Sequence, residues 1–144
     1  MRLLFLALLL ITTTAHSLDS SGTHQLREQA LAAQSQDGLL RAIQNHQSNV
    51  QVSGSGRVIK ILPDDNSGSR HQKFILRIAT GNTILIAHNI DLAPRISSLR
   101  EGDSVSFHGE FEWNPKGGVV HWTHHDPQGR HESGWLKHNG QLYQ

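Results

Sequence analysis

The C-terminal part of the chain concentrates histidines in a short segment. Four of the eleven histidines lie within residues 121–131, beside two tryptophans, in a chain without cysteine: His121, His124, His125 and His131. Imidazole titrates near neutral pH and is the commonest metal ligand in proteins. The segment therefore indicates metal binding, catalysis or ligand recognition.

The spacing of these histidines has different consequences on a helix and on a strand. On a helix, His121 and His124 would share a face and could chelate one ion. The neighbouring Val119, Val120, Trp122 and Thr123 favour a strand instead. Residues three apart on a strand point to opposite faces and lie ~10 Å apart. The H-x-x-H motif alone is therefore not expected to chelate a metal.

A turn after the motif offers another way to bring two imidazoles together. Asp126-Pro127-Gln128-Gly129 suits a type I turn. If strands continue on both sides, His124 lies opposite His131, with Cβ atoms ~4.5–5.5 Å apart. We predict a divalent metal site, with zinc as the candidate cofactor, at His124 and His131. His88 is the preferred third ligand, followed by His71 and by the carboxylate of Asp126.

Other roles for this segment remain open. A ligand could be held by the tryptophans and outer imidazoles of the hairpin, namely Trp122, Trp135, His121 and His125. In a metal-dependent hydrolase, Asp126 or Glu132 would be the candidate general base. Alternatively, the histidines lie at a partly exposed rim and bond only to the backbone, and the tryptophans belong to the core.

The elements that must position these residues are mainly strands. Hydrophobic residues alternate with polar ones in five segments separated by turns: 50–62, 71–79, 83–90, 105–113 and 119–125. The fourth is the most regular, with Val105, Phe107 and Phe111 on one face and a polar, solvated face opposite. Residues 91–100, which include Pro94, are expected to form a short helix or a looping crossover. This order predicts a small OB-like antiparallel five-stranded barrel, preceded by a short helix and carrying an additional C-terminal hairpin.

The N-terminal residues indicate export. A charged start, an apolar run too short to span a bilayer and a small or polar stretch predict a signal peptide over residues 1–17. Residues 18–37 are predicted to be a linker or weak helix, and the barrel domain with its leading helix covers 38–144. We expect no transmembrane segment after signal cleavage, and a periplasmic or secreted location.

The charge balance argues against one class of partner. Of 13 Lys and Arg residues, Arg2 lies in the predicted signal peptide, so 12 remain against 12 Asp and Glu. A formally neutral mature chain disfavours nucleic-acid binding, which depends on many basic contacts to phosphate.

Several longer strings resemble a known family. They are SRHQKFILRI, AHNIDLAPRI, LREGDSVSFHGEFEWNPKGGVVHWTHHDP and GRHESGWLKHNG. They are similar to an exported bacterial family, domain of unknown function 3465, from about residue 38 to the end. The resemblance implies a small secreted or periplasmic protein with an OB-like barrel. It implies no activity, substrate or catalytic residue.

These observations favour an exported binding module of unknown ligand that uses the His- and Trp-rich hairpin, with a divalent metal as a candidate cofactor. One alternative is a small metal-dependent hydrolase, for example one acting on phosphodiesters. A second alternative is a structural or acid-responsive protein of the envelope.

Overall fold

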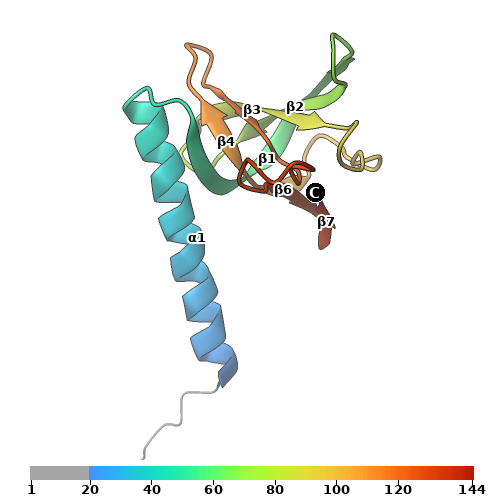
Figure 1. Cartoon of the computed structure of the whole chain (residues 1–144). Helices are drawn as coiled ribbons and strands as arrows, with labels where there is room; N and C mark the ends of the chain where they lie inside the picture. Colours follow the sequence, from blue (N-terminus) through green and yellow to red (C-terminus); the bar gives the residue numbers. More distant parts are fainter. Residues whose placement is uncertain (1–19) are drawn as a thin grey trace, which may run out of the picture.

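The computed structural model describes residues 20–144 and places one helix and seven strands in them (Figure 1). The elements follow in the order α1 (Ser20–Gln44), β1 (Val50–Asp65), β2 (His71–Arg77), β3 (Thr83–Asn89), β4 (Ser104–Glu112), β5 (Val119–His121), β6 (Trp135–His138) and β7 (Gln141–Tyr143). The mainly β prediction is confirmed.

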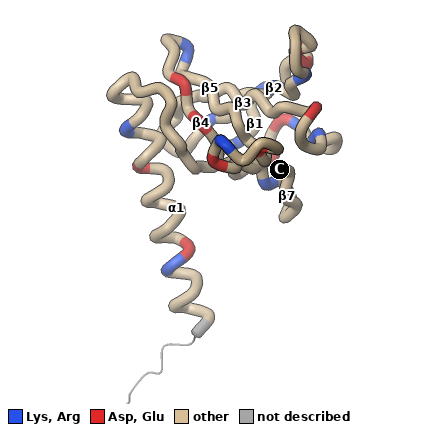
Figure 2. Tube along the Cα trace, viewed as in Figure 1, with Lys and Arg blue, Asp and Glu red and all other residues tan. Residues whose placement is uncertain are grey.

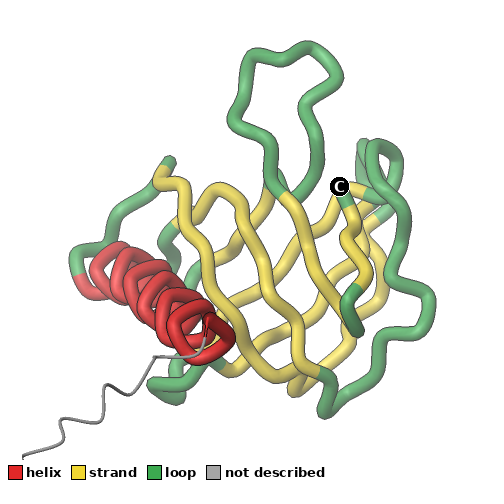
Figure 3. Tube along the Cα trace, turned by 90° about the horizontal axis from the view of Figure 1, so that it is seen from below, coloured by secondary structure: helices red, strands yellow, loops and turns green. Residues whose placement is uncertain are grey.

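Five of the strands form a closed ring (Figure 3). β1 pairs with both β2 and β4, β2 pairs with β3, β3 with β5, and β5 with β4. The β3–β5 pair is parallel, so the sheet is mixed and the prediction of an antiparallel sheet is wrong at this pair. β6 extends the sheet from β4, and β7 pairs with β6 as a C-terminal hairpin.

Apolar side chains from alternate positions fill the inside of the ring. In β4 the buried residues Val105, Phe107 and Phe111 alternate with more exposed polar ones, as predicted. Phe74 and Ile86 reach the same core from β2 and β3. Since successive side chains on a strand point to opposite faces, the polar residues between them lie on the outer face. The candidate site described below is built on that face.

The helix is longer than predicted. α1 runs from Ser20 to Gln44 without a break, so of the two alternatives predicted for residues 18–37, linker or helix, the structure has the helix from Ser20 onward. Leu39 and Ala42 are buried against the sheet, whereas every residue from 21 to 34 is exposed. The Gln- and Ala-rich N-terminal half, made largely of good helix formers, extends away from the sheet (Figure 1).

The N-terminal predictions are not covered by the structure. The signal peptide predicted over residues 1–17 lies outside the described residues. Among the residues that are described, no helix combines the length and the apolar character that crossing a membrane requires.

The histidine-rich segment is a loop, and not the predicted extended hairpin. β5 ends at His121 because Trp122 has a positive φ of 53°, a conformation incompatible with a continuing strand. The predicted turn is present, since the Gly129 amide donates to the Asp126 carbonyl oxygen at 3.0 Å. The chain then returns to β6, with the Gly134 amide donating to the carbonyl oxygen of His124. The predicted extension of β5 through residue 125 is wrong.

Candidate functional site

The outer face of β4 carries a row of polar side chains that meets polar residues of both neighbouring strands. Glu110 lies opposite Gln51 in β1 and opposite His121 in β5. Residues opposed in this way have Cβ atoms ~4.5–5.5 Å apart. The strand register therefore brings Glu110 and its neighbour Glu112 next to the first histidine of the histidine-rich segment.

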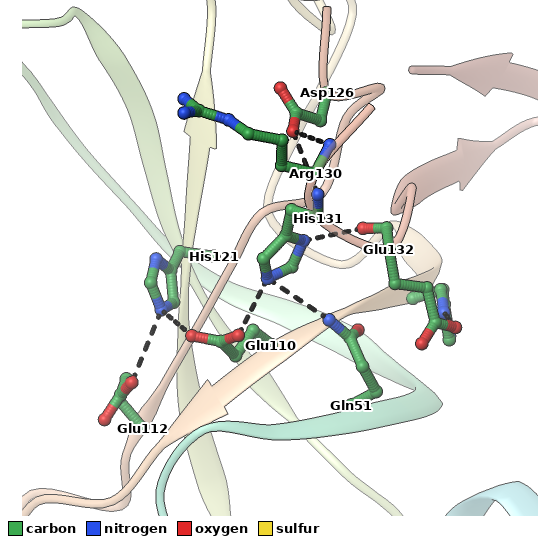
Figure 4. Close-up of polar contacts among 9 residues, drawn as sticks. Gln51, Glu110, Glu112, His121, Asp126, Arg130, His131 and Glu132 are labelled. Atoms are coloured by element: carbon green, nitrogen blue, oxygen red, sulfur yellow. Dashed lines mark hydrogen bonds and ion pairs between the residues drawn. The ribbon is translucent and has the colours of Figure 1, made fainter. Parts of the chain in front are cut away.

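Glu110, Glu112 and His121 form a compact group of potential metal ligands (Figure 4). His121 Nε2 lies 3.5 Å from Glu110 Oε1 and 3.8 Å from Glu112 Oε1. One ligand atom from each residue lies within 4.8 Å of the other two, and the described residues contain no other such group of three. The side chains are 17–33% exposed, so the group lies near the surface.

His121 Nε2 is the unusual atom of this group. It is buried, and it makes no hydrogen bond with any described residue although two carboxylates face it. An N–H···O hydrogen bond would bring the atoms to 2.7–3.2 Å. Zinc bonds of 2.0–2.2 Å in tetrahedral geometry place two ligand atoms ~3.4 Å apart. The observed separations are therefore closer to those of ligands that share an ion.

The donor chemistry is compatible with several divalent ions. Imidazole suits zinc, copper, iron and nickel, and carboxylate oxygen suits magnesium, calcium and manganese. Glu112 and His121 also line a surface depression of about 270 Å³, together with Lys73 and Ala87. Three protein ligands beside an open depression leave room for a water molecule or another ligand on the ion.

His131 orients Glu110 from the other side. Its Nε2 donates to Glu110 Oε2 at 2.7 Å, and its Nδ1 donates to the backbone carbonyl of Glu132 at 2.7 Å. Burial alone would lower the pKa of His131, but the hydrogen bonds to Glu110 and Glu132 outweigh it and raise the pKa above its ordinary value. Trp122 stacks on the same ring with centroids 4.0 Å apart. Such contacts commonly fix a ligating carboxylate.

His88, the predicted third metal ligand, lies in the core. Nε2 donates to the Pro94 carbonyl oxygen at 3.1 Å, and Nδ1 accepts from the Thr123 hydroxyl at 2.8 Å. Burial lowers the pKa of His88 to about 4, so the ring is neutral at pH 7. With both nitrogens bonded, the ring has no free lone pair for a metal ion.

The four predicted metal ligands do not form one group. His124 donates from Nδ1 to the carbonyl oxygen of His125 at 2.7 Å, and His71 donates from Nδ1 to that of Ser69 at 2.8 Å. The described residues contain no set of three ligand atoms that includes any of His71, His88, His124 or His131. The predicted pairing of His124 with His131 required β5 to continue past His121, but β5 ends there and residue 122 has a positive φ.

The remaining candidates have separate places. The Asp126 carboxylate accepts from three backbone amides, those of Gln128, Arg130 and His131, at 2.8–2.9 Å. These bonds, the one to Gln128 first, lower the pKa of Asp126 and hold the turn. Glu132 Oε1 accepts from His108 Nε2 at 2.9 Å.

The predicted ligand-binding residues are spread along the surface. Trp122 lines a depression of about 460 Å³ together with Asp126 and Arg130. His125 is exposed. Trp135, in β6, stacks beside His108 of β4, with the two ring centroids 6.2 Å apart. Of these residues only His121 belongs to the compact ligand group.

Two members of that group were missed in the sequence. Glu110 and Glu112 were expected to lie on a solvated strand face, and nothing in their alternation distinguishes a ligand from a surface residue. A signal was available in the turn between β4 and β5, because pairing the strands across residues 113–118 places both carboxylates near His121. That argument needs the register, which the turn residues alone do not determine.

Basic and acidic residues are mixed along the described part of the chain: Lys and Arg are interspersed with Asp and Glu along the trace (Figure 2).

Comparison with known proteins identifies a family. A model described as "Protein of unknown function (DUF3465)" matches residues 24–144, from within α1 through β7. No curated protein is similar enough to count as a relative. The match covers most of the sequence, and the chain therefore belongs to the DUF3465 family.

Proposed function

We propose that this protein is an exported binding module on an OB-type barrel that holds a divalent metal ion at Glu110, Glu112 and His121. The strand order β1-β2-β3-β5-β4, closing on β1, supports the barrel assignment. The signal peptide predicted over residues 1–17 supports export. An OB-type fold does not by itself imply a particular ligand, so the metal proposal rests on the geometry of Glu110, Glu112 and His121.

The observation that carries the proposal is the buried, unbonded Nε2 of His121 between two carboxylates. A lone pair on the imidazole nitrogen that faces carboxylate oxygens is unfavourable unless a cation lies between the nitrogen and those oxygens. A proton would draw the atoms to hydrogen-bond distance, but the separations are 3.5 and 3.8 Å. A metal ion of ordinary bond length accounts for both the missing hydrogen bond and the spacing.

The contact between His131 and Glu110 supports the same role. It engages Oε2 of Glu110, while Oε1 faces His121. The two oxygens of one carboxylate are thus divided between a hydrogen-bond donor and the proposed ion. This is the arrangement of a ligating carboxylate held by an outer partner.

The test is a metal titration of the purified mature protein. After treatment with a chelator, zinc binding is measured by isothermal titration calorimetry, and the dialysed protein is checked by elemental analysis. We expect about one zinc per chain, and His121→Gln and Glu112→Gln should each weaken binding by at least about tenfold, the smallest loss typical even of outer partners.

His125→Gln is the matched control, because it replaces an exposed histidine of the adjacent loop. It should bind zinc like the unchanged protein. Zinc should also raise the melting temperature of the protein and of this control, since it binds only the folded state. Zinc affinity that is equal in His121→Gln and His125→Gln would refute the proposal.

A further inference from the structure

A second cluster of reactive side chains lies on the outer face, apart from the metal group. Ser53 in β1 and His108 in β4 are directly opposed in the strand register, and Glu132 reaches His108 from the loop before β6. Ser53 Oγ lies 2.7 Å from His108 Nδ1, and His108 Nε2 lies 2.9 Å from Glu132 Oε1. Hydroxyl, imidazole and carboxylate therefore form one connected chain.

The hydrogen-bonding capacity of each group determines the direction of this chain. An ionised carboxylate only accepts, so His108 Nε2 carries the proton that is donated to Glu132. In the neutral ring Nδ1 is then the acceptor, and the Ser53 hydroxyl must donate to it. A histidine bonded in this way can act as general base on a serine nucleophile while a carboxylate holds its tautomer, with the two ring nitrogens exchanged relative to the Ser-His-Asp triad.

Ser53 also borders a cavity. A hollow of about 300 Å³ lies between α1 and residues of β1, β4 and β6, with Leu31, Phe107 and Trp135 among its lining residues. Figure 3 shows α1 lying against one side of the strands. The volume is at the lower end of the range for small-molecule sites, and the lining is largely apolar.

An unpartnered donor lines the same cavity. The amide nitrogen of Gln36 in α1 is buried and makes no hydrogen bond with any described residue. A buried amide without a partner costs free energy, about 1–3 kcal/mol. A substrate oxygen in the cavity would supply the missing acceptor, and a side-chain amide can serve as an oxyanion-hole donor.

We propose that Ser53 and His108 form a hydrolytic site for small carboxylic esters with an apolar acyl group. Glu132 is its positioning residue, and the amide of Gln36 donates to the oxyanion. The site shares no side chain with the metal group, so the hydrolytic proposal can be tested independently of metal binding.

The reaction balances with water as the only co-reactant. Ser53 Oγ attacks the ester carbonyl carbon while its proton passes to His108 Nδ1, giving a tetrahedral oxyanion next to Gln36. Collapse of this species breaks the bond to the leaving alcohol, which takes the proton from His108. Water then attacks the acyl-serine with His108 again as base, and the acid is released with Ser53 restored.

The test uses the full mature protein in the presence of a chelator, which removes any metal-dependent hydrolysis. A fluorophosphonate probe and 4-nitrophenyl butyrate are applied, the first read by mass spectrometry of the adduct and the second by release of nitrophenol. We expect a covalent adduct on Ser53 and saturable turnover, both lost in Ser53→Ala and in His108→Gln.

Ser104→Ala is the matched control, because Ser104 is an exposed serine of β4 that does not line the cavity. It should keep the adduct and the turnover. Glu132→Gln should lower kcat with KM unchanged, and Gln36→Ala should lower kcat by about 10²–10³-fold.

The proposal is overturned if circular dichroism shows Ser53→Ala to be folded and its turnover equals that of the unchanged protein. Absence of an adduct on Ser53 in the folded, unchanged protein also overturns it. If the unchanged protein binds no zinc but is still labelled on Ser53, only the metal proposal is refuted.

Discussion

His88 makes the stability of this protein dependent on pH in a way that can be calculated. Its ring is wholly buried, and both nitrogens bond to core partners, Thr123 and Pro94. Burial lowers its pKa from 6.5 to about 4. The unfolded chain therefore binds a proton between these two pH values that the folded protein does not bind. Stability from this group is complete above pH 6.5 and is lost as the pH falls toward 4.

The magnitude follows from the linkage between pKa and stability. Each pH unit between the two pKa values costs about 1.4 kcal/mol, so His88 accounts for a loss of about 2.5 kcal/mol between pH 7.5 and 4.5. His131 acts in the opposite direction. Its raised pKa contributes stability that is present at acid pH and lost as the pH rises through the folded value.

The assay is urea unfolding of the unchanged protein and of His88→Gln at pH 7.5, 5.5 and 4.5. The variant should be less stable at pH 7.5, because its amide replaces a ring bonded at both nitrogens. Its further loss on acidification should be smaller than that of the unchanged protein by about 2.5 kcal/mol. Equal losses for the two proteins would refute the argument, as would an NMR titration that places the His88 midpoint near 6.5.

Two further predictions concern packing. Leu39→Ala should destabilise the protein by about 2–5 kcal/mol, because Leu39 is wholly buried, whereas Leu31→Ala in the exposed half of α1 should change stability by no more than about 0.5 kcal/mol. Urea midpoints compare the two, and equal effects would contradict the described docking of α1. Gly134→Ala should cost about 1–3 kcal/mol, because a methyl group there would collide with the carbonyl oxygens of Trp122 and His108. Calorimetric melting would measure this loss, and an unchanged melting temperature would show that the loop before β6 is not held as tightly as described.

The strands and the core were largely predictable from the residues. Period-two alternation in residues 105–113 identifies the buried face of β4, because a strand with one buried side must place its apolar residues at every second position. The turn at 126–129 was predictable as well, since Asp126 caps it through bonds to amides at most five residues away. Both signals are local in the chain.

The extent of α1 and of β5 was not predictable. The exposed half of α1 lacks the apolar periodicity that marks a packed helix, so its sequence could not be distinguished from a linker. Trp122 carries no local sign of a positive φ, which aromatic residues rarely adopt. It takes this conformation where its ring stacks on His131, nine residues later in the chain.

Sequence alone thus established which faces are apolar, where the chain turns and where imidazoles are concentrated, because each depends on neighbours within a few residues. It named His121 but could not name its partners. Glu110 and Glu112 meet His121 through the pairing of β4 with β5, and Ser53 meets His108 across 55 residues through the pairing of β4 with β1. Only the tertiary structure decides such contacts, because a shift of one residue in strand register would turn these side chains to the opposite face.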